Sequence, residues 1–287
     1  MGFKASIIGG AGGMGQWFAG HLSNLGVEVC ISDIDSCRAK EIAQRYGYQF
    51  SESNIHAVNN ADFVLVAVPM RFMKSVIDEI AEHIDRGAII CEIASFKMQH
   101  FSILKRLNKA GLTTLSLHPM FGPSAVKVED LTFAVIPVES QEGEVELANS
   151  LFPGADIVAV DVETHDRVMS NVLSLTYLMN LAFSLTVNEN EVNILKKLAG
   201  TSFTLQMGLA ESITLENIDL VNTILHNNHF SEETIERYLN NIEKLKDQSK
   251  FINTFSELNN RFRENLDKKS IDNWRYESYL SYRAMKP

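Results

Sequence analysis

The stretch Gly10-Ala11-Gly12-Gly13-Met14-Gly15 decides the fold, because it has the spacing G-x-G-x-x-G between two recognisable elements. The mostly apolar residues 3–9 before it predict a strand, and the apolar periodicity after it predicts a helix that Gly26 ends. In such a turn Gly10 allows a tight bend, Gly12 lets the backbone approach a pyrophosphate, and Gly15 lets helix and strand pack closely. The stretch therefore predicts a dinucleotide site at the positive end of the helix.

Asp33 follows a second predicted strand, residues 27–32, and lies 23 residues after Gly10. A carboxylate at this position can accept hydrogen bonds from both ribose hydroxyls and repels a 2′-phosphate, so the sequence favours NAD over NADP. The alternative is a glycine-rich turn followed by a solvent-exposed aspartate. Val68 and Pro69 end the next long strand, residues 61–68, and either border the cofactor or only terminate the strand.

Glycine and proline are unevenly distributed along the chain, and this predicts two domains. Fourteen of the 16 glycines and five of the six prolines lie at or before Gly154. Strands alternate with helices in this half, which predicts a doubly wound α/β domain of the Rossmann type with a mostly parallel sheet over residues 1–162. The further predicted strands cover residues 88–93, 113–117, 133–138 and 157–162.

The second half has few residues that break helices, so residues 163–287 are expected to form an all-helical domain. The expected helices cover residues 166–187, 191–213, 215–227, 231–247, 249–266 and 271–284. The first of them is apolar nearly all round, which predicts burial on most sides. In so small a domain this favours packing against a second subunit, as in a homodimer.

Composition and charge exclude several classes of protein. The net charge is −10, and each half carries −5, so nucleic acid is not an expected partner. A run of about 18 apolar residues and a signal peptide are both absent, so no membrane association is expected. Three cysteines suit a reduced cytoplasm, and the sequence has no motif that indicates a metal.

Two segments at the ends of predicted strands carry the residues suited to catalysis. His118, between a strand and Pro119, is held by a rigid backbone and can titrate near neutrality, so it can accept a proton from a hydroxyl group undergoing oxidation. Ser95 could bind this imidazole or the substrate, and Lys97 could supply positive charge to the substrate. A capping or packing role for His118 is the alternative.

Thr164-His165-Asp166 lies where the two predicted domains meet. Thr164 is a plausible N-cap of the long apolar helix. His165 is expected either to line a cleft that binds substrate or to have a structural role.

Together these motifs resemble the prephenate dehydrogenase family of tyrosine biosynthesis. The resemblance rests on the glycine turn, Ser95-Phe96-Lys97, the segment from His118 to Gly122, and Thr164-His165-Asp166 followed by Met169. It implies an NAD(P)-binding domain and a helical dimerisation domain. It also implies that prephenate, or arogenate in some members, is oxidised with loss of CO2. His118 would then accept a hydrogen bond from the ring hydroxyl, and Ser95 would position both groups.

One segment departs from the family pattern. Members carry arginines for the substrate carboxylates where this chain has Thr204 and Ser212. A neutral pocket binds a dianion poorly, so other basic residues compensate, the substrate differs, or the activity is low. The candidate bases are Lys97, Arg167, Lys196 and Lys197.

The leading hypothesis is therefore an NAD-dependent prephenate or arogenate dehydrogenase. The two alternatives are a dehydrogenase of another cyclic or hydroxy-acid substrate and a non-catalytic, dinucleotide-binding regulatory protein.

Overall fold

The computed structural model describes residues 2–187, 191–265 and 268–285, which form two compact units, Met1–Asp166 and Arg167–Pro287. We call them the α/β unit and the helical unit. The eight strands of the α/β unit form a single sheet in the order β3-β2-β1-β4-β5-β6-β7-β8. The strands are β1 (Lys4–Ile8), β2 (Glu28–Ser32), β3 (Gln49–Phe50), β4 (Phe63–Val66), β5 (Ile89–Glu92), β6 (Thr113–Pro119), β7 (Thr132–Val135) and β8 (Asp156–Ala159).

Strands β1 to β6 run parallel to one another, β7 pairs antiparallel with β6, and β8 runs parallel to β7. The order reverses at β1, as in doubly wound sheets that bind ligands at the carboxyl ends of their strands. This confirms the predicted fold class.

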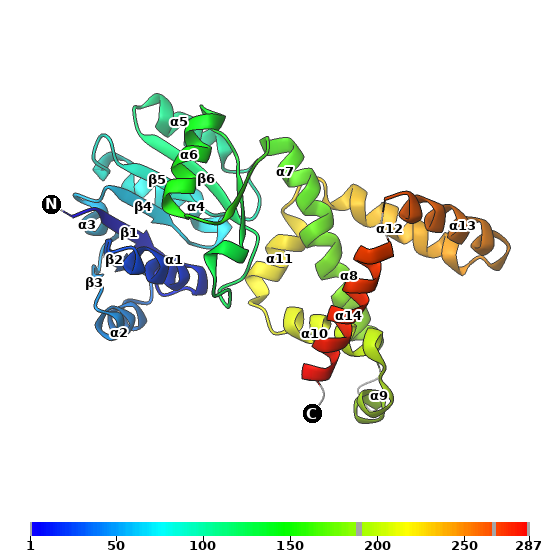
Figure 1. The fold of residues 1–287 in the computed structure, drawn as a ribbon. Helices are drawn as coiled ribbons and strands as arrows, with labels where there is room; N and C mark the ends of the chain where they lie inside the picture. The colour runs from blue at the N-terminus through cyan, green and yellow to red at the C-terminus, as the bar shows by residue number, and fades with distance from the viewer. Residues whose placement is uncertain (1, 188–190, 266–267, 286–287) are drawn as a thin grey trace. The chain divides into compact units, whose positions relative to one another are not determined.

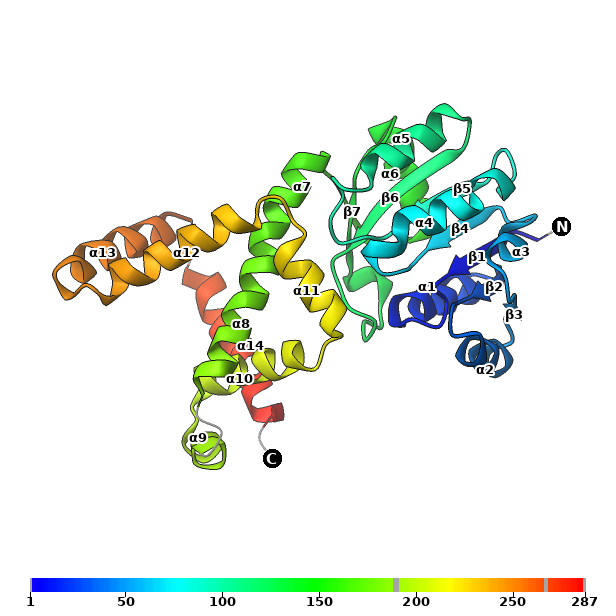
Figure 2. The ribbon, with the colours of Figure 1, turned by 180° about the vertical axis from the view of Figure 1, so that it is seen from behind.

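Helices cover both faces of the sheet. The front face in Figure 1 carries α1 (Gly13–Asn24) and α6 (Gln141–Leu151), whereas α4 (Met70–Ile80) and α5 (Phe101–Lys109) lie in front in Figure 2. The remaining short elements of the unit are α2 (Ser36–Tyr46), α3 (Asn54–Val58), η1 (Ala81–His83) and η2 (Val128–Asp130). A buried apolar cluster joins α1, α2 and α6 to the sheet, and it includes the aromatic side chains of Phe18, Phe133 and Phe152.

The helical unit begins within one continuous helix that comprises α7 (Val162–Met169), a π-helical turn η3 (Ser170–Leu175) and α8 (Thr176–Thr186). The elements that follow are α9 (Val192–Leu198), α10 (Thr201–Thr214), α11 (Ile218–His226), α12 (Ser231–Lys246), α13 (Gln248–Asn265) and α14 (Lys268–Met285). The prediction of a single helix over 191–213 is wrong. The structure has two helices there, separated by Ala199 and Gly200, and Gly200 has the extended backbone of an N-cap.

Two other local predictions are also wrong. Thr164 does not cap the long helix, because Asp161 does so, accepting from the backbone N–H groups of Glu163 (3.1 Å) and Thr164 (3.0 Å). The strand that carries His118 does not end before it. It runs on through Pro119, because β7 pairs with residues 117–119 beyond the end of β5.

Candidate active site

The glycine turn has the geometry that close packing requires, although the role of Gly10 differs from the prediction. The left-handed backbone lies at Gly9 (φ +85°), where a Cβ would be 2.4 Å from the carbonyl oxygen of Ala67. Gly10 is required for another reason, because a Cβ there would lie 2.6 Å from Cβ of Ile31 on β2. The tight turn assigned to Gly10 therefore belongs to Gly9, which precedes the motif.

The later glycines of the turn bring α1 close to β1. A Cβ on Gly15 would lie 2.2 Å from the carbonyl oxygen of Gly9, so only glycine fits there. The N–H of Gly12 donates to the same oxygen (3.1 Å), and α1 begins at the next residue, Gly13. The first N–H groups of a helix lack partners within the helix, so this end of α1 suits an anion such as a pyrophosphate.

Asp33 lies directly beside the turn, as the motif predicts. Its Oδ2 atom accepts from the N–H of Ala11 at 2.9 Å, and its Oδ1 atom accepts from the N–H of Asp35 at 3.0 Å. Val68 also borders the turn, since its Cγ1 atom lies 3.2 Å from the position of a Cβ on Gly9. Pro69 is exposed and is the N-cap residue of α4. The predicted cofactor residues of β1, β2 and β4 therefore lie at one end of the sheet.

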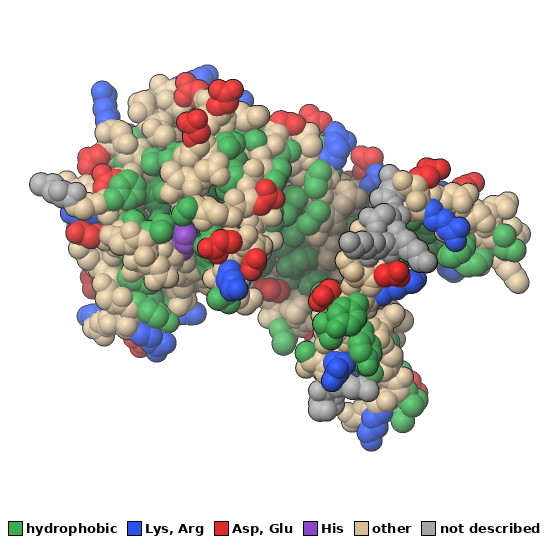
Figure 3. All heavy atoms as spheres, viewed as in Figure 1, with side chains coloured by type: hydrophobic (Ala, Val, Ile, Leu, Met, Phe, Trp, Pro, Cys, Tyr) green, Lys and Arg blue, Asp and Glu red, His purple; other side chains and the backbone are tan. Residues whose placement is uncertain are grey.

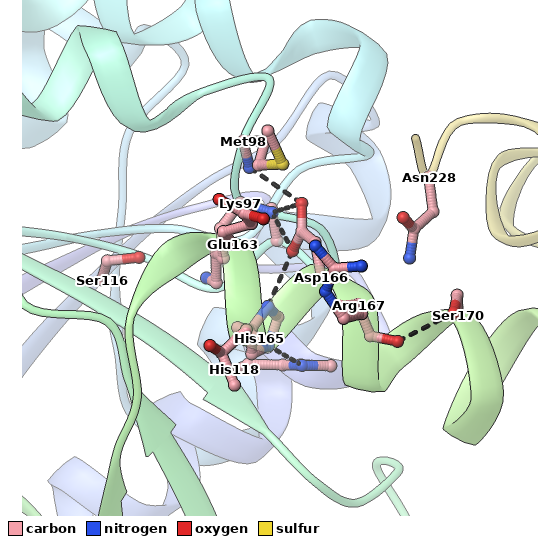
Figure 4. A network of polar contacts seen from close by, with 12 residues as sticks. Lys97, Met98, Ser116, His118, Glu163, His165, Asp166, Arg167, Ser170 and Asn228 are labelled. Atoms are coloured by element: carbon pink, nitrogen blue, oxygen red, sulfur yellow. Dashed lines mark hydrogen bonds and ion pairs between the residues drawn. The ribbon is translucent and has the colours of Figure 1, made fainter. Parts of the chain in front are cut away.

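The catalytic candidate His118 lies in a buried chain of three side chains with His165 and Asp166 (Figure 4). Nδ1 of His118 lies 2.9 Å from Nε2 of His165, and Nδ1 of His165 lies 2.7 Å from Oδ1 of Asp166. The exposed fractions of the three residues are 5%, 1% and 2%. His165 thus packs against His118 inside the α/β unit.

Asp166 also binds the loop that follows β5. Its Oδ1 and Oδ2 atoms accept from the N–H of Lys97 at 2.9 and 3.1 Å, and Oδ2 accepts from the N–H of Met98 at 2.9 Å. One carboxylate therefore joins α7 to this loop. The sequence prediction used Asp166 only as part of a motif and missed this function.

The structure contradicts the prediction that Lys97 offers its charge to a substrate. Its side chain is 1% exposed, and its ammonium group donates to Oε1 of Glu92 (2.8 Å) and to the carbonyl oxygen of Leu117 (2.6 Å). Glu92 also accepts from the N–H of Ala94 and from the hydroxyl of Ser116. The sequence does carry a signal for this buried pair. Glu92 is a charged residue within the otherwise apolar predicted strand 88–93, and a buried charge needs a partner.

Ser95 is half-buried on the same loop, between Ala94 and Phe96. Within the part of the chain that the structure describes, it makes no hydrogen bond to His118. One of the two ring nitrogens of His118, Nδ1, faces His165. Nδ1 of His118 is therefore engaged by His165 and not by Ser95, and no hydrogen bond between described residues uses the other nitrogen, Nε2.

The pKa of His118 is well below its usual value. Burial is the main cause, and the Lys97 ammonium and His165 add to it. The expectation that His118 titrates near neutrality is therefore wrong. The imidazole stays neutral at physiological pH and can act as a hydrogen-bond acceptor.

The segment that departs from the family pattern lies on α10. Ser212 is exposed, and its hydroxyl donates to the carbonyl oxygen of Leu209 within the same helix. The nearby cation Lys196 is paired with Glu211 at 2.7 Å. Across residues 2–187, 191–265 and 268–285, no group of three or more histidine, cysteine or acidic residues could hold a metal ion.

Comparison with protein families gives the same assignment as the motifs. Residues 18–140 match the nucleotide-binding domain of prephenate dehydrogenase, and residues 161–268 match its dimerization domain. The chain belongs to the prephenate dehydrogenase family. The predicted family is confirmed, and the predicted dinucleotide cofactor is confirmed at the level of a nucleotide-binding domain.

Two curated relatives show how this family varies in its substrates. A protein of Methanocaldococcus jannaschii described as a probable arogenate/prephenate dehydrogenase is 30% identical over 90% of this chain and 60% of its own length. A 4-amino-4-deoxyprephenate dehydrogenase of Streptomyces pristinaespiralis is 27% identical over 67% of this chain and 65% of its own length. The chain thus spans less than two thirds of either relative.

Solved structures of the family have the same fold. Arogenate dehydrogenase from Synechocystis matches with a TM-score of 0.66 and 15% identity, covering 92% of this chain and 100% of the other. Prephenate dehydrogenase from A. aeolicus, solved with hydroxyphenyl propionate and NAD+, matches with a TM-score of 0.67 and 15% identity over 92% and 98% of the two chains. At this identity the likeness concerns the fold.

Proposed function

We propose that this protein oxidises prephenate with NAD+, releasing CO2 and forming 4-hydroxyphenylpyruvate. The observation that carries the proposal is His118, a neutral imidazole whose Nδ1 atom is engaged by His165 and whose Nε2 atom has no hydrogen-bond partner among the described residues. His118 lies near the carboxyl end of β6, the strand next to β5, and the glycine turn follows the carboxyl end of β1. The family membership supports the same reaction.

The roles of the residues follow from this arrangement. Bound NAD+ would accept the hydride from the ring carbon that carries the hydroxyl group. Nε2 of His118 accepts the hydroxyl proton as positive character develops on that carbon, and later returns it to the phenolate oxygen of the product. Loss of the ring carboxylate as CO2 makes the ring aromatic, so the overall reaction is effectively irreversible.

The direct test is turnover by the purified chain. It is incubated with NAD+ and prephenate, arogenate or 4-amino-4-deoxyprephenate in turn, and reduced cofactor and CO2 are measured. We expect the highest kcat/KM with prephenate. NAD+ binding without turnover of any of the three would reject the proposal in favour of a regulatory, dinucleotide-binding protein.

Arogenate is the second candidate substrate, and the composition of α10 favours it. Thr204 and Ser212 stand where the family carries arginines, and Lys196 is paired with Glu211. Arogenate has an ammonium group in place of the side-chain keto group, so its net charge is one unit less negative than that of prephenate. It therefore needs less positive charge in the pocket. A higher kcat/KM with arogenate in the same assay would select it.

Asp33 is expected to set the preference for NAD. Asp33→Asn keeps an acceptor for the N–H of Ala11 but removes the charge that repels a 2′-phosphate. The ratio of kcat/KM for NAD+ to that for NADP+ should fall roughly tenfold or more, since hydrogen bonds to charged groups contribute about 1.5–3 kcal/mol. Asp35→Asn, which alters only the cap of α2, is the control and should leave the ratio unchanged. An unchanged ratio in Asp33→Asn would exclude Asp33 as the ribose ligand.

We also infer that the helical unit forms a homodimer. The helix Val162–Thr186 is apolar enough to cross a membrane by length and composition alone, yet only 22% of its most apolar window is buried in this chain. The prediction of burial on most sides therefore fails for the single chain. Figure 3 shows further apolar side chains on the helical unit. The exposed ones on α12 and α13 include Leu239, Phe251, Ile252, Phe255 and Phe262.

A second copy of the chain would cover these faces, as the match to the family's dimerization domain supports. Size-exclusion chromatography with light scattering should give twice the mass of the chain. A monomer at micromolar concentration would contradict the proposal. A biosynthetic dehydrogenase of this kind is expected in the cytoplasm.

A further inference from the structure

We propose that Asp166, acting through His165, determines which nitrogen of His118 carries the proton. Asp166 and His165 are then positioning residues, and this inference rests on the proposed function of His118 as an acceptor. The contacts that carry it are all buried within the α/β unit: Asp166 to His165 at 2.7 Å, and His165 to His118 at 2.9 Å.

The position of each proton follows from Asp166, the residue at one end of these contacts. Both oxygens of Asp166 accept from main-chain N–H groups, so Asp166 is the acceptor in its contact with His165. The proton between them therefore belongs to Nδ1 of His165. In a neutral imidazole the other nitrogen is an acceptor, so Nε2 of His165 accepts from Nδ1–H of His118. This leaves a lone pair on Nε2 of His118.

The reverse order would cost free energy in this environment. If Nδ1 of His118 were the acceptor, His165 would have to donate from both nitrogens and carry a positive charge. The Asp166 carboxylate would pair with that charge, but a second buried cation would then lie in the region where the Lys97 ammonium already lowers the pKa of His118. Two neutral imidazoles, with the lone pair on Nε2 of His118, satisfy every contact without a second buried cation.

Asp166 also connects this chain to the loop after β5. The N–H groups of Lys97 and Met98 bind the same carboxylate, and Ser95 lies two residues before Lys97. The residue that orders the protons of His118 therefore also holds the segment that carries Ser95. A change at Asp166 should affect both, whereas a change in the side chain that caps α7, Asp161, should affect neither.

Asp166→Asn tests the inference because it reverses the proton order while keeping the size of the side chain. The single carbonyl oxygen of asparagine is needed where the N–H groups of Lys97 and Met98 converge, so its NH2 group faces His165. His165 then becomes an acceptor at Nδ1 and a donor at Nε2, and His118 carries its proton on Nε2. We expect kcat to fall at least about tenfold, with KM for NAD+ unchanged.

The matched control is Asp161→Asn at the start of the same helix. The Asp161 side chain also binds two main-chain N–H groups, but it caps α7 and does not bind the imidazole of His165; the main-chain bond from the N–H of His165 to the carbonyl oxygen of Asp161 is kept in the variant. Its variant should keep kcat within about twofold of the unmodified protein. Equal losses in the Asp161 and Asp166 variants would show that a loosened helix is the cause and would overturn the inference.

A second pair of variants covers the case in which Asp166→Asn does not fold. His165→Gln offers a carbonyl oxygen to Nδ1–H of His118, whereas His165→Leu offers no acceptor. We expect the glutamine variant to keep at least about tenfold more activity than the leucine variant. Equal activity in these two would overturn the role of His165.

A spectroscopic measurement separates this inference from the proposed function. In protein labelled with 15N only at histidine, NMR should show His118 protonated at Nδ1, and protonated at Nε2 in Asp166→Asn. The signal of His118 is assigned by its loss in His118→Asn. If the unmodified protein turned over none of the three substrates, the proposed function would fail while this reversal still tested the inference. A proton on Nε2 in the unmodified protein would overturn it.

Discussion

Replacing His118 by asparagine is expected to lower kcat at least about 100-fold, the lower end of the contribution of a positioned acid–base group. Asparagine is polar and fits the space, but it cannot hold a proton at the position of Nε2. The contact with His165 at 2.9 Å is then remade or lost, while the glycine turn is not touched. The affinity for NAD+ should therefore stay close to that of the unmodified protein.

The control for this variant is His56→Asn. His56 is exposed on α3, so its replacement should leave kcat unchanged. Steady-state kinetics with the best substrate, together with titration of NAD+ by fluorescence, separates loss of catalysis from loss of cofactor. A fully active His118→Asn would exclude His118 as the acceptor of the hydroxyl proton.

The low pKa of His118 predicts the pH dependence of the reaction. An acceptor must be neutral, and burial and the Lys97 ammonium keep this imidazole neutral well below pH 6.5. The profile of kcat/KM, which reports the free enzyme, should show no acidic limb from His118 between pH 8 and 6. Half-loss of kcat/KM near pH 6.5 that disappears in His118→Asn would contradict this.

The same low pKa affects stability. Below about pH 6.5 His118 binds a proton in the unfolded chain but not in the folded chain, so its contribution makes the fold less stable as the pH falls.

Sequence periodicity predicted most of the α/β fold because buried parallel strands and turn glycines leave strong local signals. It missed β3, which has two residues, and α3, which has five, because elements this short have no measurable period. It also merged α9 with α10. Gly200 can stand within a helix or cap one, and only its extended backbone in the structure decides between the two.

The site was predicted less completely than the fold, because the contacts that define it join residues far apart in sequence. The turn around Gly12 and the position of Asp33 depend on local backbone, and the motif predicted both. The pairing of His118 with His165 spans 47 residues and that of Lys97 with Asp166 spans 69, so no spacing rule could reveal them. Lys97 shows the consequence. A lysine beside a catalytic loop suggested a substrate ligand, whereas its environment makes it part of the core.

The second large effect is expected at this core pair. Lys97→Met should lower the free energy of unfolding by about 3–5 kcal/mol, because it leaves the carboxylate of Glu92 buried without its cation. Both side chains are only 1% exposed, so water cannot replace the lost partner. Urea unfolding followed by circular dichroism measures the loss, and KM for the substrate of the folded protein should change little.

Two further variants separate the buried charge from other effects of the substitution. In Glu92→Gln combined with Lys97→Met no charge is left alone, so the double variant should be more stable than Lys97→Met although it carries one more substitution. Lys74→Met removes a lysine from an exposed pair with Asp78 and should leave the stability nearly unchanged. If Lys97→Met instead raised KM strongly without loss of stability, Lys97 would be a substrate ligand after all. The ammonium of Lys97 also donates to the carbonyl oxygen of Leu117, which precedes His118 on β6. A loss of stability without a change in KM would therefore show that the pair of Lys97 and Glu92 stabilises the strand that carries His118 and does not bind the substrate.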